Sequence, residues 1–124
     1  ISLSMKPYQD ARLEGEKLAK QYAELEKADQ VDFYNGLEGY YSVLGHNKKQ
    51  EAIAVLIEKN DHKIYVYQLD KGISQDKAAT ISREKGASDI DKVTFGRYQD
   101  KPIWEVKSGN QYYLVDFETG AVIQ

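Results

Sequence analysis

The sequence has no cysteine among its 124 residues. Disulfide bonds, thiolate zinc sites and cysteine nucleophiles are therefore excluded. The absence of cysteine is compatible with a reducing compartment and equally with an extracytoplasmic surface that does not depend on disulfides, so it leaves the compartment open.

The sequence also lacks an excess of positive charge and any long apolar run. Its net charge of −3 excludes the broad basic footprint with which nucleic-acid-binding proteins neutralise phosphates. The longest apolar run, residues 52–57, has the length of a strand and falls far short of the roughly 20 residues that span a bilayer. The chain starts at Ile1 instead of methionine, so we expect a further segment, including any membrane anchor, to precede it in the full protein.

The first half of the chain has the pattern of one helix followed by four strands. Apolar residues spaced alternately by three and four positions predict an amphipathic helix over residues 7–28. Turn-forming residues such as Asn35-Gly36 separate the segments that follow, which is typical of an antiparallel meander. The predicted strands are residues 31–35, 40–44, 51–58 and 63–69.

The second half repeats this order. Ser74 is a predicted helix N-cap and Gly86 a predicted C-terminal stop. The predicted strands are residues 92–98, 102–107, 111–117 and 121–123. We therefore expect two domains, residues 1–70 and 71–124.

The matched halves predict an α+β fold built from tandem cystatin-like repeats. In each repeat a helix packs on a curved antiparallel sheet of three to four strands. Alternation along the strands places Tyr41 and Val43 toward the first helix, and Trp104, Val106, Tyr113, Val115 and Phe117 in the second core. The corresponding positions are Val31 and Val93, Tyr41 and Trp104, Val43 and Val106, and Val55 and Val115.

No set of residues predicts catalysis. Ser74-x-x-Lys77 and Ser108-Gly109-Asn110 match two motifs of penicillin-interacting serine enzymes, but the third motif survives only as Thr119-Gly120 without its lysine. The chain is also too short for that fold, and helix capping is a sufficient role for Ser74. We expect no enzyme and no cofactor.

The two histidines, His46 and His62, lie in predicted turns. A zinc site needs three or four convergent ligands, and the sequence does not assemble them. We therefore interpret both histidines as surface residues and expect no metal site.

Ten tyrosines are the one compositional excess. Tyrosine is favoured in strands and enriched in interface hot spots. The side chains that alternation directs away from the helices form a candidate partner surface, namely Tyr40, Leu44, Leu56, Tyr112 and Leu114. The alternative is that these apolar faces pack the two halves on each other.

The second half resembles the PepSY domain, an extracytoplasmic binding or inhibitory module of bacteria. The residues that carry the resemblance are Ile73-Ser74, Ala78-Ala79, Trp104-Glu105-Val106, Tyr113-Leu114-Val115-Asp116 and Thr119-Gly120. A helical start, a cystatin-like first half and a PepSY-like second half together resemble the TseB-like (YpmB-type) family of Gram-positive bacteria. That resemblance covers essentially the whole chain.

The resemblance implies an extracytoplasmic protein, tethered by an N-terminal anchor that this chain lacks. It further implies a non-enzymatic module that regulates cell wall elongation by contacting a penicillin-binding synthase. Edge strands, with unpaired backbone groups, are a second route to such a contact. Two alternatives stay open: a PepSY-type inhibitor of a cell-surface peptidase, and a hydrolase of unrecognised type, which would need an apolar pocket with a shifted carboxylate or histidine.

Overall fold

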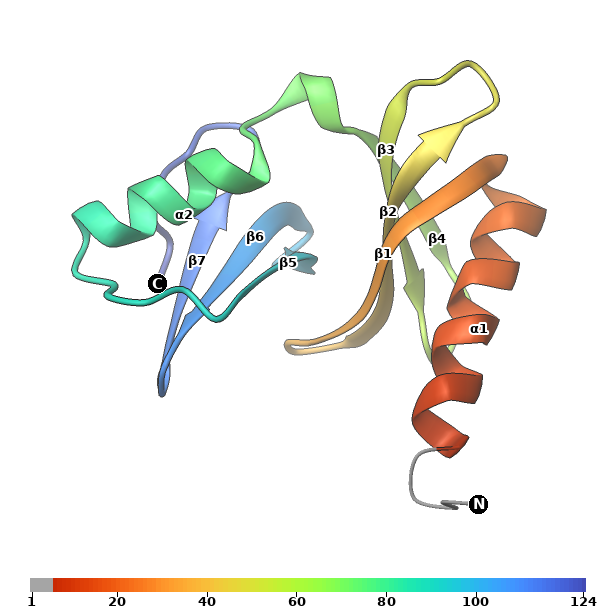
Figure 1. Cartoon of the computed structure of the whole chain (residues 1–124), viewed down its shortest axis with the longest axis horizontal. Coiled ribbons are helices and arrows are strands. Elements are labelled where there is room, and N and C mark those ends of the chain that lie inside the picture. Colours follow the sequence, from red (N-terminus) through yellow and green to blue (C-terminus); the bar gives the residue numbers. More distant parts are fainter. Residues whose placement is uncertain (1–5) are drawn as a thin grey trace. The chain divides into compact units, whose positions relative to one another are not determined.

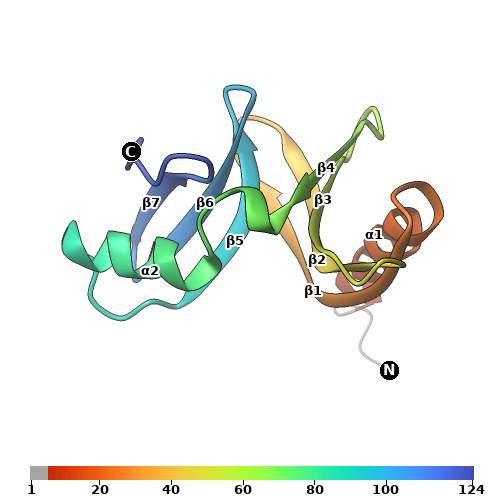
Figure 2. The same ribbon diagram turned by 90° about the horizontal axis from the view of Figure 1, so that it is seen from above.

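The computed structural model describes residues 6–124 and confirms the predicted α+β class. The chain divides into two compact units, Ile1–Tyr67 and Gln68–Gln124, and each has its own helix and antiparallel sheet (Figures 1 and 2).

The first unit places one helix against a four-stranded meander in the order β1-β2-β3-β4. The helix covers one face of the sheet (Figure 1). The elements are α1 (Lys6–Tyr22), β1 (Leu25–Asn35), β2 (Gly39–Asn47), β3 (Ala52–Glu58) and β4 (Ile64–Gln68). All four predicted strands are present.

The prediction that the first helix continues to residue 28 is wrong. Helix α1 ends at Tyr22, and Glu24 has a left-handed φ of 57°, which interrupts the helical path. Leu25 continues the apolar spacing of the helix, but it opens β1 and pairs with Asn47 of β2. Pairing with a neighbouring strand therefore overrides the helical period over residues 25–28.

The core of the first unit lies between α1 and the sheet. Gly15 and Ala19 face it, and a Cβ at Gly15 would lie 3.2 Å from the side chain of Tyr41, so the absence of a side chain lets the helix approach the sheet closely. Val43 is fully buried and has Val31 and Val55 opposite it on the two flanking strands. The predicted orientation of Tyr41 and Val43 toward the helix is confirmed.

The second unit contains a short 3-10 helix, one α-helix and three strands in the order β5-β6-β7. These elements are η1 (Leu69–Lys71), α2 (Gln75–Glu84), β5 (Lys92–Tyr98), β6 (Lys101–Ser108) and β7 (Gln111–Asp116). The predicted strand over residues 121–123 is wrong: this segment makes one isolated bridge, Val115 with Val122. Backbone hydrogen bonds between Leu114 and residues 123 and 124 still hold it against β7.

Both ends of α2 match the prediction. The Ser74 hydroxyl accepts a hydrogen bond from the amide of Lys77 at 3.0 Å, as an N-cap does. At the other end, Gly86 has a φ of +112°, and the amide of Ala87 donates to the carbonyl of Ser82 at 3.0 Å. Only glycine adopts that φ without strain, so Gly86 ends the helix.

An aromatic cluster forms the core of the second unit. The ring of Trp104 lies 4.9 Å from that of Phe95 and 6.4 Å from that of Phe117, and all three side chains are buried. The indole Nε1 of Trp104 donates to the carbonyl of Ile73 at 3.0 Å, which ties the start of α2 to the sheet. Of the predicted core residues, Tyr113 is only half-buried.

Candidate protein-binding surface

The residues that imitate a serine-enzyme motif have structural roles. Ser74 caps α2, and Ser108 is buried at the end of β6, where it pairs with Gln111. Thr119 accepts a hydrogen bond from the amide of Ala121 through its hydroxyl. The hydroxyls of Ser74 and Thr119 therefore each accept a hydrogen bond that organises the local backbone, and Ser108 is part of the buried sheet.

Replacement of Ser74 by alanine tests the capping role directly. Loss of an N-cap hydroxyl is expected to lower the free energy of unfolding by about 1 kcal/mol, and Ser74→Asp, which restores an acceptor, is expected to recover most of it. Denaturant unfolding measures both effects. Equal losses in the two variants would contradict the role of Ser74 as a cap.

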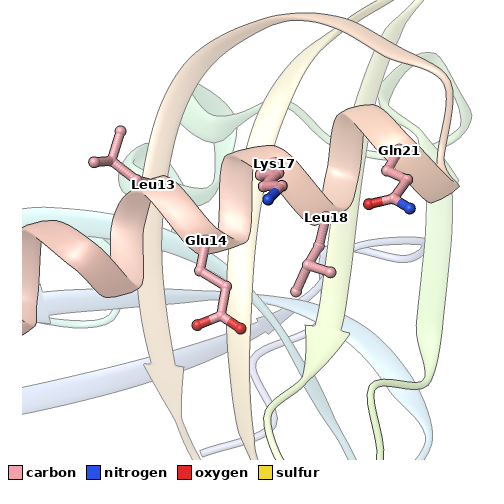
Figure 3. Close-up of a pocket in the computed structure, with 5 residues that line it drawn as sticks. All are labelled: Leu13, Glu14, Lys17, Leu18 and Gln21. Atoms are coloured by element: carbon pink, nitrogen blue, oxygen red, sulfur yellow. The ribbon is translucent and has the colours of Figure 1, made fainter.

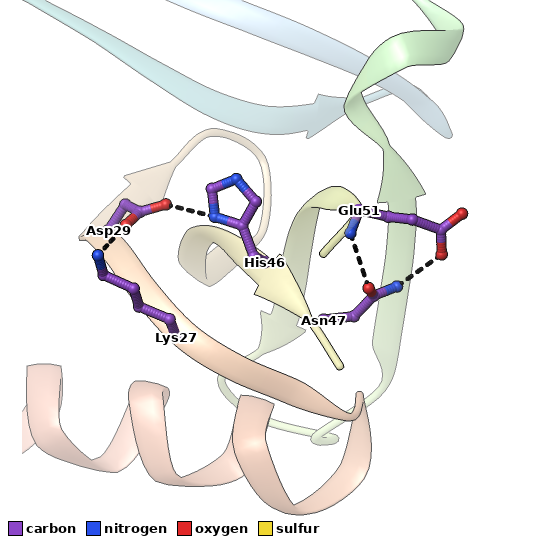
Figure 4. Close-up of polar contacts among 5 residues, drawn as sticks. All are labelled: Lys27, Asp29, His46, Asn47 and Glu51. Atoms are coloured by element: carbon purple, nitrogen blue, oxygen red, sulfur yellow. Dashed lines mark hydrogen bonds and ion pairs between the residues drawn. The ribbon is translucent and has the colours of Figure 1, made fainter. Parts of the chain in front are cut away.

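The two histidines differ in their surroundings. His46 lies in β2, not in the predicted turn, and its Nδ1 is 3.0 Å from a carboxylate oxygen of Asp29, beside the ammonium of Lys27 (Figure 4). The neighbouring Asn47 accepts from the amide of Glu51 and closes the β2–β3 turn (Figure 4). His62 is an exposed turn residue with a φ of 55°.

Neither histidine belongs to a metal-binding group. Among residues 6–124, no three His, Asp or Glu side chains are arranged to hold a metal ion. Within that same range, no helix combines the length and the apolar character needed to cross a membrane.

Two shallow hollows run along α1, and Figure 3 shows one of them. The lining residues of this hollow are Leu13, Glu14, Lys17, Leu18 and Gln21. Because all of them belong to a single helix, the hollow lacks the enclosing walls of a small-molecule site.

The five residues of the predicted partner surface differ in their exposure to solvent. Tyr112 is 55% exposed on β7. The other four side chains are buried, with exposed fractions of 2% for Tyr40, 8% for Leu44, 0% for Leu56 and 6% for Leu114. Of the five, only Tyr112 is therefore open to a partner in this structure, and the assignment of all five to one surface stays a prediction.

Tyr112 is one of several large apolar side chains that the structure leaves exposed. They are Leu13, Tyr22, Leu37, Val66, Tyr112 and Ile123. The most exposed is Leu37, at 76%, in the turn between β1 and β2. Alternation along strands could not find Leu37, because a turn residue belongs to neither face. The available signal was an apolar residue directly after the turn-forming pair Asn35-Gly36.

The Asp-to-Gly turn after β7 organises the end of the chain. The carboxylate of Asp116 accepts hydrogen bonds from the amides of Glu118 and Thr119, at 2.8 and 2.9 Å. Gly120 closes the turn with a φ of +80°. The residues that carry the sequence resemblance in this segment therefore build a turn.

The carboxyl group of Glu105, in the second unit, has a perturbed pKa. Burial raises its pKa above the ordinary value of 4.5, and the nearby ammonium of Lys92 acts in the opposite direction. Glu105 lies between Thr94 and Leu114 on the neighbouring strands, at the middle of the sheet. The folded state therefore pays a penalty for the charged form of this side chain.

The Glu105→Gln variant is expected to raise the thermal midpoint modestly at pH 7 and to leave it unchanged below pH 4. Because the pKa of Glu105 is higher in the folded state than its ordinary value of 4.5, the folded chain keeps the proton on this group to a higher pH than the unfolded chain does. The free energy of unfolding contributed by this group therefore falls as the pH rises above about 4.5. Glutamine is uncharged, so the substitution removes the penalty at pH 7 and has none to remove below pH 4. Thermal unfolding at both pH values, with the exposed Glu118→Gln as control, measures it. A lower midpoint at pH 7 would contradict the account.

Comparisons with known proteins agree with one another. Residues 14–58 match the family model described as the cell wall elongation regulator TseB-like domain. The chain is 38% identical over 114 residues to the "Probable cell wall elongation regulator TseB" of Bacillus subtilis (strain 168), covering 86% of this chain and 70% of that protein. The solved structure of the YpmB protein from Bacillus subtilis superposes with a TM-score of 0.77 and 34% identity, over 90% of this chain and 93% of that one.

Proposed function

The chain belongs to the TseB-like family of cell wall elongation regulators, and from this we propose that it regulates cell wall elongation as a non-enzymatic binding module. Its partner is a penicillin-binding synthase. The observation that carries the proposal is the 38% identity, along most of the chain, to a protein named as a regulator of this process. The local structural roles of Ser74, Ser108 and Thr119 favour binding over catalysis.

We infer that the protein acts outside the cytoplasm, tethered to the cell membrane. Wall synthesis takes place on that side, and a regulator that touches a synthase must be held near it. The tether raises the effective concentration of the regulator at the membrane, so a modest contact area suffices for binding.

We further propose that residues 1–70 and 71–124 are tandem cystatin-like domains, the second of them PepSY-like. Strand pairing supports an internal correspondence: Val31 lies opposite Val43, as Val93 lies opposite Val106. The aromatic pairs Phe33–Tyr41 and Phe95–Trp104, whose rings are in contact, also occupy equivalent registers. In that register the counterpart of Val115 is Ile57 instead of Val55. Val115 lies opposite Trp104, and Ile57 lies opposite Tyr41, the counterpart of Trp104.

Capture from intact cells tests the proposed function. Cells are treated with fluorescent penicillin, which marks penicillin-binding proteins covalently, and the tagged full-length protein is then cross-linked and purified. We expect a fluorescent synthase to be captured with it. The exposed Tyr112→Ala variant reports whether the second unit contributes to the contact.

Absence of any fluorescent band, with the protein itself recovered, would overturn the proposed contact. Specific capture of a cell-surface peptidase instead would favour the inhibitor function.

A further inference from the structure

The tip of the β1–β2 hairpin presents an apolar side chain to solvent. Leu37 lies in the three-residue turn 36–38, which the pair Asn35 and Gly39 closes, and its side chain is 76% exposed. A single exposed leucine is common on protein surfaces. Two further features distinguish Leu37: the backbone of its turn packs on buried aromatic rings, and carboxylates surround it.

The turn rests on buried aromatic rings. A Cβ at Gly36 would lie 2.6 Å from the ring of Tyr34, so the backbone of the turn packs directly on this ring, whose residue is only 1% exposed. The ring of Tyr40 lies beside that of Tyr34, tilted against it with ring centroids 6.4 Å apart, and the Tyr40 hydroxyl donates to a carboxylate oxygen of Glu38 at 3.1 Å. The backbone of the turn that carries Leu37 is thus packed on buried side chains, which lowers the conformational entropy lost on binding.

The β3–β4 turn lies beside this tip. Figures 1 and 2 show both turns at the same end of the sheet. A hydrogen bond from the amide of Lys59 to the carbonyl of Gly39, 3.0 Å long, joins the two turns. The residue before Lys59, Glu58, lies opposite Tyr40.

Carboxylates crowd at this end of the sheet. Burial is the main cause that raises the pKa of Glu58, and the charges of Glu38 and Asp61 raise it further against the opposing effect of Lys63. The ammonium of Lys59 lies over the ring of Phe33, 4.8 Å from its centroid. A cationic partner group would relieve the repulsion among these carboxylates, whereas an anionic lipid or wall polymer would add to it.

We propose that the hairpin tip, residues 35–39, together with the adjoining turn, residues 58–62, docks on a protein partner that offers an apolar recess bordered by Arg or Lys side chains. Leu37 fills the recess, and the carboxylates of Glu38 and Glu58 pair with the basic side chains. The inference rests on the proposed function, because it locates the surface by which the synthase is bound.

Site-specific photo-crosslinking in cells labelled with fluorescent penicillin tests this surface. A photo-crosslinking amino acid replaces Leu37 in one full-length protein and Leu13, which is 65% exposed on α1, in a control. We expect the fluorescent synthase to be cross-linked from position 37 and not from position 13.

Matched substitutions separate the apolar and the charged contributions. Leu37→Ser is expected to lower capture of the synthase about tenfold, the size of effect typical of an interface anchor, while Leu13→Ser leaves it unchanged. Glu38→Lys is expected to lower it as well, and Asp89→Lys, the same charge change at an exposed site of the second unit, is not. If Glu38→Lys lowers the thermal midpoint, Glu38→Gln, which still accepts from Tyr40, replaces it.

The outcomes separate the two proposals. Capture of the synthase that neither Leu37→Ser nor the Glu38 variants reduce would overturn the docking surface and leave the proposed function standing. Failure of the unsubstituted protein to capture any fluorescent synthase would overturn both.

Discussion

Replacement of Trp104 by alanine is expected to lower the free energy of unfolding by about 3–5 kcal/mol, as is typical for a large aromatic side chain in a core. Trp104 is 1% exposed and contacts both Phe95 and Phe117, so its removal leaves a cavity between rings that are fixed by the sheet. The carbonyl of Ile73 also loses its indole donor. Because Trp104 is the only tryptophan, circular dichroism is the appropriate probe of denaturant unfolding.

The matched control is Tyr112→Ala in the same sheet. Tyr112 is 55% exposed, and its replacement is expected to change stability by no more than about 0.5 kcal/mol. Similar losses in both variants would contradict the assignment of the core to the Trp104 face of the sheet.

Ile57→Ala is expected to have the second-largest effect, a loss of about 2–5 kcal/mol. Ile57 is fully buried on β3 opposite Tyr41, in the cluster that also contains Ala19 of α1. Its truncation removes contacts between sheet and helix, and denaturant unfolding measures the loss.

The control for Ile57 is Val66→Ala on the neighbouring strand. Val66 is 49% exposed and is expected to contribute little. If the two substitutions had equal effects, the assignment of Ile57 to the packed core of the first unit would be wrong.

Local signals predicted much of the fold. Ser74 and Gly86 were found as helix ends because capping depends on side-chain and backbone chemistry within a few residues. Alternation placed Val43 and Trp104 in the two cores because a strand has a period of two.

Nonlocal pairing explains the errors in the fold. The sequence around Leu25 fits a helix, but the segment pairs with β2, and no pattern within the helix reveals that partner. Residues 121–123 fit a strand and hydrogen-bond to β7, but after the turn that Asp116 and Gly120 build they form one isolated bridge and no regular strand.

The candidate site was harder to predict than the fold. Alternation correctly separates Tyr40 and Leu56 from the helix-facing residues, but it cannot say whether their face is exposed, because that depends on tertiary packing. Alternation makes no prediction for Leu37, because this residue lies in the turn between β1 and β2 and belongs to neither face of the sheet.

Direct binding is the measurement that tests the central claim most closely. The purified chain is titrated against the purified extracytoplasmic domains of penicillin-binding synthases, each in turn, at two salt concentrations. The account predicts saturable binding to at least one synthase, weakened by salt because charged groups at the contact are screened. A correctly folded chain that binds none of them would contradict it.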